Sequence, residues 1–319
     1  MGILSPIKDL ALRARERVRP SWERWIHHLG NRRGSRAWVR DVNFDIAARC
    51  NLRCRYCSLD HDAATASMPL ELFTRVLDEI SDRRRFRVTR IQLHHGADPL
   101  LHPQLADVLG ALAERKGRAG FPETRLLTNA MLLQGARRDA IFESGGIDFI
   151  RFSIDGGTPE DFERMRPPAK WDRVAGNVEA FLEENEARGK PLRTGMISLF
   201  DRVPETLHPR FEALSKRVDH YMPRMPHRWD GSADLDLPPP PEIPPGLCMF
   251  VLVQVVVRYD GSVLPCCNDL NARGPVGNLA ESTLYDIVRG PERERLARLM
   301  KQGKRCEIDL CRNCDIGLR

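Results

Sequence analysis

Three cysteines stand close together early in the chain, at a spacing that suits an iron–sulfur cluster. Cys50, Cys54 and Cys57 form the pattern CxxxCxxC on a short loop. Thiolate sulfur is a soft ligand that holds iron in cubane clusters. Because a [4Fe–4S] cluster contains four irons, three cysteines leave one iron without a protein ligand, and an open coordination position is typical of a reactive metal centre. Zinc, or three unrelated thiols, are the alternatives.

A second group of cysteines lies near the C-terminus. The chain has nine cysteines, an odd number that excludes complete disulfide pairing. No secretory signal precedes them, so we expect a reducing cytoplasm, where clustered thiols indicate metal or redox chemistry rather than disulfides. The second group comprises Cys248, Cys266, Cys267, Cys306, Cys311 and Cys314.

Length and composition are those of a folded globular protein. The chain has 319 residues, of which 42% are hydrophobic and 29% charged. At about 150 residues per domain, this length predicts one large domain or two, and the composition excludes extensive disorder. The longest apolar run, residues 247–257, is too short to cross a bilayer as a helix.

The elements that must position the first three cysteines follow a repeating pattern. Short apolar runs alternate with helical segments from residue 41 onward, which predicts βαβ units and a parallel sheet. The cysteine loop directly follows the first strand, at the end of the strand where ligands bind in α/β barrels. Expected strands are 42–47, 88–94, 124–129, 147–155 and 192–199, and expected helices are 67–80, 105–115 and 174–189, the first capped by Ser67 with Pro69 in its first turn.

Five to six βα units are too few for an eight-unit barrel of about 250 residues. We therefore expect an α/β fold with a partial (βα)6 TIM-like barrel over residues 41–230. Residues 231–246 contain six prolines and predict an extended linker. After the linker, a strand with a turn at Asp260-Gly261 predicts a hairpin, followed by helices over 283–289 and 291–302. Residues 247–319 thus form a small cysteine-rich domain.

The net charge of +6 belongs to an N-terminal extension, residues 1–40, which holds ten Lys and Arg against three Asp and Glu. Trp22, Trp25, Ile26 and Leu29 recur at helical spacing there. Such a basic amphipathic helix packs its aromatic side on its own domain or contacts an anionic membrane surface or an acidic partner. No nucleic-acid-binding module accompanies the charge, so nucleic acid is not an expected partner.

The segment CNLRCRYC, residues 50–57, resembles the signature of the radical S-adenosylmethionine (SAM) superfamily. The resemblance implies that the open iron binds the amino and carboxylate groups of SAM. It also implies that the cluster donates an electron, supplied by a flavodoxin or ferredoxin, and that a 5′-deoxyadenosyl radical then removes a hydrogen atom from the substrate. Tyr56 fills the aromatic position that packs near the adenine.

Further pieces of the resemblance fall at the ends of the expected strands. In HHGADP, residues 94–99, Gly96 keeps the close backbone approach to SAM, Ala97 stands at the glutamate position, and Asp98 offers a carboxylate one residue later. The resemblance assigns SAM binding to Tyr56, Gly96, Asp98, Thr128, Asn129, Ser153, Asp155 and Arg166, with Arg193 as an alternative to Arg166. Nearby His94, His95 and His102 are either substrate contacts or structural histidines, and Trp229 and Arg228 are candidates to line the cavity between the domains.

The C-terminal cysteines resemble the SPASM/twitch domain of radical SAM enzymes. The matching parts are Cys248, Gly261-x4-Cys266, the GNL stretch at 277–279, and Cys311-x2-Cys314. The resemblance implies one auxiliary [4Fe–4S] cluster held by Cys248, Cys266, Cys311 and Cys314, with zinc, or Cys306 replacing one ligand, as alternatives. Cys267 and Cys306 are then bystanders or catalytic thiols that give a hydrogen atom to a substrate radical.

The resemblance leaves several substrates open, because its twitch members include an aminocyclitol alcohol dehydrogenase and its SPASM members modify ribosomal peptides. A short chain with one auxiliary cluster favours a small polar substrate, such as a sugar or aminocyclitol, that is oxidised or epimerised with the auxiliary cluster as electron acceptor. One alternative is a peptide-modifying maturase whose basic N-terminal helix binds an acidic leader. Another is a non-catalytic zinc protein that binds RNA or a membrane through residues 1–40.

Overall fold

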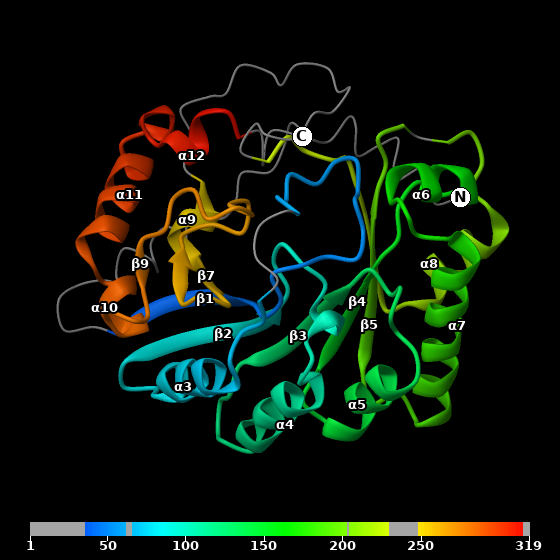
Figure 1. Cartoon of the computed structure of the whole chain (residues 1–319), viewed down its shortest axis with the longest axis horizontal. Helices are drawn as coiled ribbons and strands as arrows, with labels where there is room; N and C mark the ends of the chain where they lie inside the picture. The colour runs from blue at the N-terminus through cyan, green and yellow to red at the C-terminus, as the bar shows by residue number, and fades with distance from the viewer. Residues whose placement is uncertain (1–35, 62–65, 203, 230–247, 315–319) are drawn as a thin grey trace.

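The computed structural model describes residues 36–61, 66–202, 204–229 and 248–314, which share one central sheet (Figure 1). Its nine strands lie in the order β6-β5-β4-β3-β2-β1-β7-β8-β9. Strands β1 to β6 and β7 pair in parallel, and β8 and β9 are antiparallel. The parallel strands are β1 (Ala37–Asp45), β2 (Phe86–Leu93), β3 (Glu123–Thr128), β4 (Phe149–Ser153), β5 (Arg193–Leu199), β6 (His220–Arg224) and β7 (Gln254–Arg258).

Six parallel strands, of which the first five are each followed by a described helix, confirm the expected partial barrel. The helices after the strands lie along the outer side of the sheet in Figure 1. Alternation along β4 explains the packing: Ile150 and Phe152 are fully buried on the helix side, and the Phe152 ring meets Phe181 of α7 edge to face at 5.5 Å. These helices are α3 (Leu70–Ser81), α4 (Leu105–Lys116), α5 (Ala136–Ser144), α7 (Trp171–Ala187) and α8 (Pro209–Arg217), with the one-turn η1 (Pro99–Leu101) before α4.

The start of α3 differs from the sequence expectation. Ser67 does not cap the helix; it forms a bridge with Ala47, just after β1. Pro69 is the N-cap instead, without a side-chain hydrogen bond, and the helix begins at Leu70. The prediction of a Ser67 cap was wrong because this residue is taken up by backbone pairing with the segment that leads into the cysteine loop. The buried face of the helix is as expected: Phe73, Val76, Leu77 and Ile80.

Several short elements were not expected from the sequence. Among them are α6 (Pro159–Met165), β6 and α9 (Met249–Val253). Strand β6 contains Pro223, which an edge strand tolerates because it pairs on one side only. Helix α9 occupies the first half of the apolar run 247–257, where helix and strand cannot be told apart by periodicity.

The C-terminal part continues the barrel sheet. Strand β7 pairs with β1, and β8 (Ser262–Leu264) completes the hairpin expected at Asp260-Gly261. A second hydrophobic cluster joins α9 and α11 to Trp38 on β1. The barrel also begins at Ala37, four residues before the expected boundary. The remaining elements are β9 (Gly277–Asn278), α10 (Leu284–Val288), α11 (Pro291–Lys301), η2 (Arg305–Glu307) and α12 (Asp309–Arg312).

Two sequence predictions fall outside the described residues: the amphipathic helix around Trp22 and Trp25, and the proline-rich linker at 231–246. Within the described ranges, no helix combines the length and the apolarity needed to cross a membrane.

Candidate active site

The loop that carries the first three cysteines leaves β1 at its carboxyl end. A turn from the Cys57 amide to the Cys54 carbonyl, 3.0 Å, brings these two residues together. The Arg53 amide donates to the Pro167 carbonyl at 2.6 Å, and the Arg55 amide donates to Met165 at 3.0 Å. The loop is therefore held by its backbone against the chain that follows α6.

The three thiols of this loop fit a cationic cluster. All three are free and partly exposed. Burial raises the pKa of Cys50 to about 12 and that of Cys57 to about 11, and it also raises the pKa of Cys54. The thiolates raise one another's pKa as well, which shows that they lie together. Burial thus disfavours the thiolate form of all three cysteines, and the positive charge of bound iron would stabilise that form.

The thiols do not surround a single point. Among the residues that the structure describes, no three His, Cys, Asp or Glu side chains converge on one metal ion. A cubane cluster binds each thiolate through a different iron, so its ligands stand farther apart than those of a mononuclear site.

A buried polar group links the cysteine loop to the end of β4. The Tyr56 hydroxyl donates to Asp155 at 2.6 Å, and the Arg166 Nε donates to the same Asp155 oxygen at 2.6 Å. Arg166 also donates to Ser153. Asp155 is 0% exposed and Arg166 4%. Burial raises the pKa of Tyr56 far above its usual value, so its hydroxyl remains a donor.

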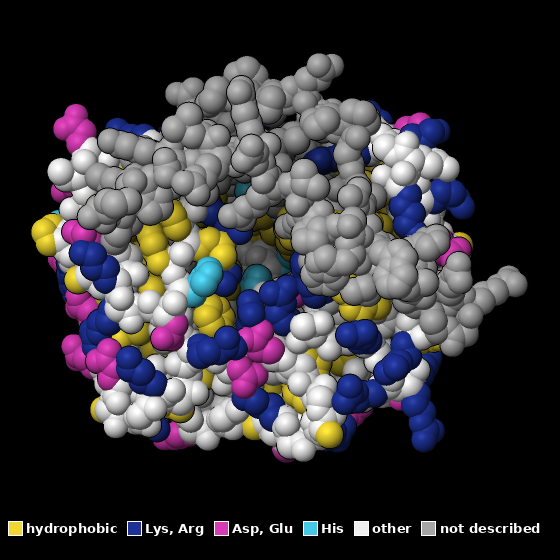
Figure 2. Space-filling view, turned by 180° about the vertical axis from the view of Figure 1, so that it is seen from behind, with side chains coloured by type: hydrophobic (Ala, Val, Ile, Leu, Met, Phe, Trp, Pro, Cys, Tyr) yellow, Lys and Arg dark blue, Asp and Glu magenta, His cyan; other side chains and the backbone are white. Residues whose placement is uncertain are grey.

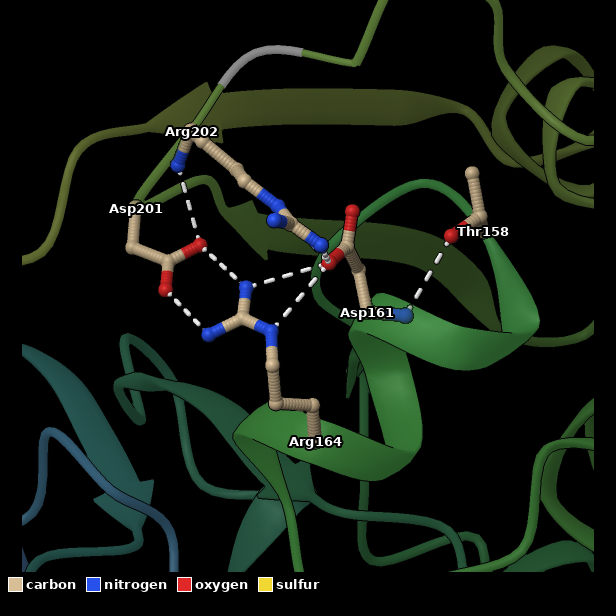
Figure 3. Close-up of polar contacts among 5 residues, drawn as sticks. All are labelled: Thr158, Asp161, Arg164, Asp201 and Arg202. Atoms are coloured by element: carbon tan, nitrogen blue, oxygen red, sulfur yellow. Dashed lines mark hydrogen bonds and ion pairs between the residues drawn. The ribbon is translucent and has the colours of Figure 1, made fainter.

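Helix α6 places Arg166, and polar contacts fix α6 in turn (Figure 3). Thr158 caps the helix by accepting from the Asp161 amide at 3.2 Å. Arg164 bridges Asp161 and Asp201, and Arg202 donates to Asp161 from the loop after β5. The helix that ends beside the cysteine loop is thus tied to the neighbouring strand end.

Gly156 permits this close approach. Its φ is +81°, and a Cβ there would lie 2.7 Å from the Asp161 Cβ and 2.8 Å from its backbone carbon. We expect Gly156→Ala to lower the free energy of unfolding by about 3 kcal/mol, from left-handed strain plus a backbone clash. The control is Gly145→Ala, at φ +63° with nothing within 4 Å, for which strain alone predicts about 1 kcal/mol. Equal losses for the two variants in urea unfolding would contradict the clash.

Asp98 joins the ends of β2 and β3. Its carboxylate accepts from the Leu100 amide at 2.9 Å, the Thr128 hydroxyl at 2.9 Å and the Asn129 amide at 2.7 Å. Burial raises the pKa of Asp98, and these three hydrogen bonds oppose the rise. The structure thus places Asp98, Thr128 and Asn129 together, with Asp98 organising the two strand ends.

Asn129 and Gly96 both contact the cysteine loop. The Asn129 amide group donates to the Asn51 side chain at 2.8 Å and lies 3.9 Å from the Cys50 sulfur. A Cβ on Gly96 would lie 2.9 Å from the Leu59 side chain, so the expected close approach is made to the loop itself.

Two further residues hold the loop. The Trp229 indole donates to the Tyr56 carbonyl at 2.6 Å. Asn271, from the C-terminal part, donates to the Ser58 carbonyl at 2.7 Å and accepts from the Asp60 amide at 2.8 Å. Trp229 was a sequence candidate for the cavity between the domains, whereas a single loop asparagine gives no pattern by which Asn271 could be found.

The histidines and Arg193 occupy different surroundings. His102 accepts from the Gln104 amide at 3.1 Å and lies 3.0 Å from the Met68 carbonyl, as a structural histidine does. His95 is buried with its Nδ1 3.4 Å from Asp45. Arg193 begins β5, at the end of the barrel opposite the cysteine loop, and pairs with Glu123. The Nδ1 of His94 is buried and has no hydrogen-bond partner among the described residues.

The four cysteines expected to hold the auxiliary cluster lie near one another. Burial raises the pKa of Cys311 to about 12, and Cys248 and Cys314 raise it further. A hydrogen bond with Cys267, burial and Cys248 raise the pKa of Cys266. Cys266, Cys311 and Cys314 are buried, within or beside the hydrophobic cluster around α9 and α11. Four soft donors in an apolar shell fit an iron–sulfur cluster.

Asn268 and Arg305 surround these cysteines with donors. The Asn268 amide group donates to the Cys314 sulfur at 3.6 Å, and its backbone N–H donates to the Cys266 sulfur at 3.4 Å. Buried Arg305 donates to the carbonyls of Cys311 and Cys314. Neither residue was a sequence candidate.

We expect Asn268→Ala to shift the reduction potential of the auxiliary cluster to a more negative value, because hydrogen bonds to cluster sulfurs favour the reduced state. The affinity of the four cysteines for the cluster should also fall roughly 10-fold, as it does when other residues that orient metal ligands are replaced. Redox titration followed by electron paramagnetic resonance measures the potential. Asn271→Ala is the control, since its side chain binds the loop backbone and no sulfur; an unchanged potential in Asn268→Ala would refute the role.

The two remaining cysteines differ in position. Cys267 lies where Gln254, His95 and Asp41 influence its charge, and the hydrogen bond from Cys266 lowers its pKa to about 7. It therefore faces the barrel. Cys306 is exposed on η2, which packs on α11 and α12. Of these two cysteines, Cys267 is the one influenced by barrel residues on β1, on β7 and just after β2.

Comparisons with known proteins agree with this site. The sequence model of the radical SAM superfamily matches residues 45–201, and that of an iron–sulfur cluster-binding domain, SPASM, matches residues 248–315. The two matched regions contain both groups of cysteines.

Individual relatives match this chain over most of its length. The S-adenosyl-L-methionine-dependent 2-deoxy-scyllo-inosamine dehydrogenase of Niallia circulans is 22% identical over 279 residues, covering 86% of this chain and 92% of the relative. The crystal structure of BtrN in complex with AdoMet and 2-DOIA has a TM-score of 0.59 at 21% identity, covering 88% of this chain and 94% of that one.

A peptide-bound structure is also similar in fold. Streptococcus suis SuiB bound to precursor peptide SuiA has a TM-score of 0.65 at 14% identity, covering 88% of this chain and 71% of that one. The two matching family models, on either side of residues 202–247, account for most of the chain. The protein is therefore a radical SAM enzyme with a C-terminal SPASM-type iron–sulfur domain, a family whose cofactors are SAM, a SAM-binding [4Fe–4S] cluster and an auxiliary cluster.

Proposed function

We propose that this enzyme oxidises a small polar substrate at a carbon that bears a hydroxyl group. The observation that carries the proposal is the similarity to the Niallia circulans dehydrogenase, which extends through both parts of the chain and 92% of the relative's length. A match confined to the barrel would support radical SAM chemistry but not this reaction.

We assign the cofactors to the residues that fit them. Cys50, Cys54 and Cys57 hold the cluster that binds SAM, and the four C-terminal cysteines hold the auxiliary cluster. When bound, the first cluster and SAM supply the one-electron chemistry that removes a hydrogen atom from carbon. A flavodoxin or ferredoxin is the proposed electron donor.

The chain's own residues position these groups. Asp155, fixed by Arg166 and Tyr56, holds the cysteine loop against the end of β4, next to Ser153. Asp98 holds Thr128 and Asn129 at the end of β3. Together they form the surface on which SAM binds. Loss of a hydrogen atom, a proton and an electron converts the alcohol to a carbonyl. The auxiliary cluster, which the four C-terminal cysteines would hold, would supply the acceptor for that electron.

A peptide substrate is the second candidate, supported by the fold similarity to SuiB bound to its precursor peptide. The match covers 71% of that protein, compared with 92% of the Niallia circulans dehydrogenase, so alcohol oxidation is the first candidate. The non-catalytic zinc alternative is set aside, because the chain belongs to an enzyme superfamily.

The test uses enzyme reconstituted anaerobically with iron and sulfide, then supplied with SAM, a reductant and a panel of sugars and aminocyclitols. We expect one substrate to give a carbonyl product and an equal amount of 5′-deoxyadenosine. A substrate deuterated at the reacting carbon should transfer that deuterium to 5′-deoxyadenosine. Turnover only with peptides would refute the proposal.

Epimerisation predicts a different outcome. The product would keep its oxidation state and gain hydrogen from solvent through a thiol, for which Cys267 is the better placed candidate. In deuterium oxide, oxidation predicts no deuterium on the product carbon, and Cys267→Ala should still form the carbonyl. Cys306→Ala, at an exposed position, is the matched control.

A further inference from the structure

One cation inside the barrel, Arg151, forms no ion pair within the described part of the chain. Arg151 projects from β4, and the groups that influence its charge include Arg90 on β2 and Arg224 on β6. Neither strand is a neighbour of β4 in the sheet. Arg151 therefore lies on the inner, concave face, opposite Ile150 and Phe152, which pack against the helices.

Three carboxylates of β1 and β3 each lie near an arginine other than Arg151. Asp41 pairs with Arg90 at 2.5 Å, and Glu123 pairs with Arg125 at 2.6 Å. Glu123 also pairs with Arg193, and Asp45 lies 3.5 Å from Arg258. Glu123 attracts Arg151 as well, but it already pairs with Arg125 and Arg193, and no ion pair to Arg151 forms among the described residues.

Arg151 itself forms no hydrogen bond or ion pair within the described part of the chain. Its Nε is buried without a partner, and its guanidinium lies 5.1 Å from the centre of the Phe149 ring. Burial, then Arg125 and Arg224, lower its pKa to about 10, so it remains charged at neutral pH. A buried polar group without a partner calls for a ligand or water to satisfy it.

A second unsatisfied donor lies beside it. His94 directly follows β2, and its buried Nδ1 has no hydrogen-bond partner. Leu93 pairs with Leu126, and Leu126 with Ile150, so His94 lies level with Arg151 across the sheet. Burial and then Arg151 lower the pKa of His94 to about 4, which leaves His94 neutral. Neutral imidazole can donate one hydrogen bond from a ring N–H.

This pair lies within reach of the proposed reaction. Arg151 precedes Ser153 by two residues on the same face of β4, a separation of about 7 Å along a strand. Figure 2 shows a hollow near the middle of one face, with basic and histidine side chains around it. A substrate below the SAM-binding strand ends would therefore meet Arg151.

We propose that the substrate carries an oxyanion, a carboxylate or a phosphate ester, that pairs with Arg151 and accepts a hydrogen bond from His94 inside the barrel. This inference rests on the proposed function and adds the charge of the substrate to it. A protonated amine at the same position would be repelled by Arg151 and its neighbouring arginines. The guanidinium fork matches the geometry of both kinds of oxyanion.

The experiment measures anion binding to the reconstituted enzyme with SAM present, by isothermal titration with inorganic phosphate and with malonate. Potassium chloride of equal ionic strength is the blank, and glucosamine is the cationic probe. We expect one or both oxyanions to bind and glucosamine not to bind. The stronger of the two anions identifies the group as phosphate or carboxylate.

Arg151→Gln should weaken that binding roughly 10-fold or more, as expected for a lost charge-assisted pair. Arg193→Gln is the matched control, because Arg193 is exposed at the other end of the barrel and should leave binding unchanged. Anion binding that is absent in the wild type, or equal in Arg151→Gln, would overturn the proposal.

SAM also carries a carboxylate, so its affinity is measured in the same variants. We expect Arg151→Gln to bind SAM within about 2-fold of wild type; a 10-fold loss would assign Arg151 to SAM and overturn the substrate proposal. Oxidation of a neutral substrate without any anion binding would refute this inference and leave the proposed function standing. Anion binding without 5′-deoxyadenosine formation would refute the proposed function instead.

Discussion

Replacing Cys50, Cys54 and Cys57 together with alanine is expected to abolish reductive cleavage of SAM and to remove about four of about eight irons per chain. The reason is that these thiols are the proposed ligands of the cluster that binds SAM. Iron analysis and the yield of 5′-deoxyadenosine under dithionite measure the two effects. The residual iron should give the spectrum of the auxiliary cluster alone.

A reciprocal variant makes this result specific. Cys311→Ala with Cys314→Ala removes two proposed ligands of the auxiliary cluster and should leave SAM cleavage in place while substrate oxidation is lost. Cys306→Ala, exposed on η2, should leave both clusters intact. SAM cleavage that survives in the triple variant would show that the loop after β1 does not carry the reactive centre.

Arg166→Met is expected to destabilise the protein by about 3–5 kcal/mol, because it leaves the buried Asp155 carboxylate without its countercharge. Asp155 is fully buried, and the Tyr56 hydroxyl and the Leu199 amide would be its remaining donors. Urea unfolding under anaerobic conditions measures the loss. SAM cleavage should fall as well, since the Asp155 contact positions the cysteine loop.

The nearby Arg164 provides the control for Arg166. Its side chain is 29% exposed, and Asp161 keeps Arg202 as a partner when Arg164 is removed. Arg164→Met should therefore cost about 1 kcal/mol. If the two arginine variants lost equal stability, Asp155 would be solvated or otherwise compensated, and the account of this buried pair would be wrong. Adding Asp155→Asn to Arg166→Met should restore part of the lost stability.

The sequence predicts the barrel well because its signals are local and repeated. The period of the apolar residues in α3 and α7, and the apolar strands between helices, each reflect burial on one face. The Asp260-Gly261 turn predicts its hairpin for a similar reason. Pairing between distant strands has no such signal. Strand β7 pairs with β1 across more than 200 residues, whereas the proline-rich linker between them predicts two separate domains rather than one continuous sheet.

The candidate site is predictable where a motif sets both residue type and spacing. The CxxxCxxC loop and the strand-end residues Asp98, Asn129 and Asp155 lie together as their order along the strands predicts. The partner of Arg166 was not predictable, because short helix α6 turns the chain back toward Asp155. Thr158, Pro159 and Glu160 carry a helix-start signal that could have revealed α6. Arg151 has no sequence signal for its inward position, because an arginine within a strand resembles a surface residue until the curvature of the sheet is known.

The central claim is that the cluster of Cys50, Cys54 and Cys57 keeps one iron open for SAM. Electron paramagnetic resonance of the reduced wild-type enzyme, with and without SAM, tests it most directly. The account predicts two cluster signals, of which one changes its g-values when SAM is added while the other does not. Two signals that both ignore SAM, with no 5′-deoxyadenosine formed, would contradict it.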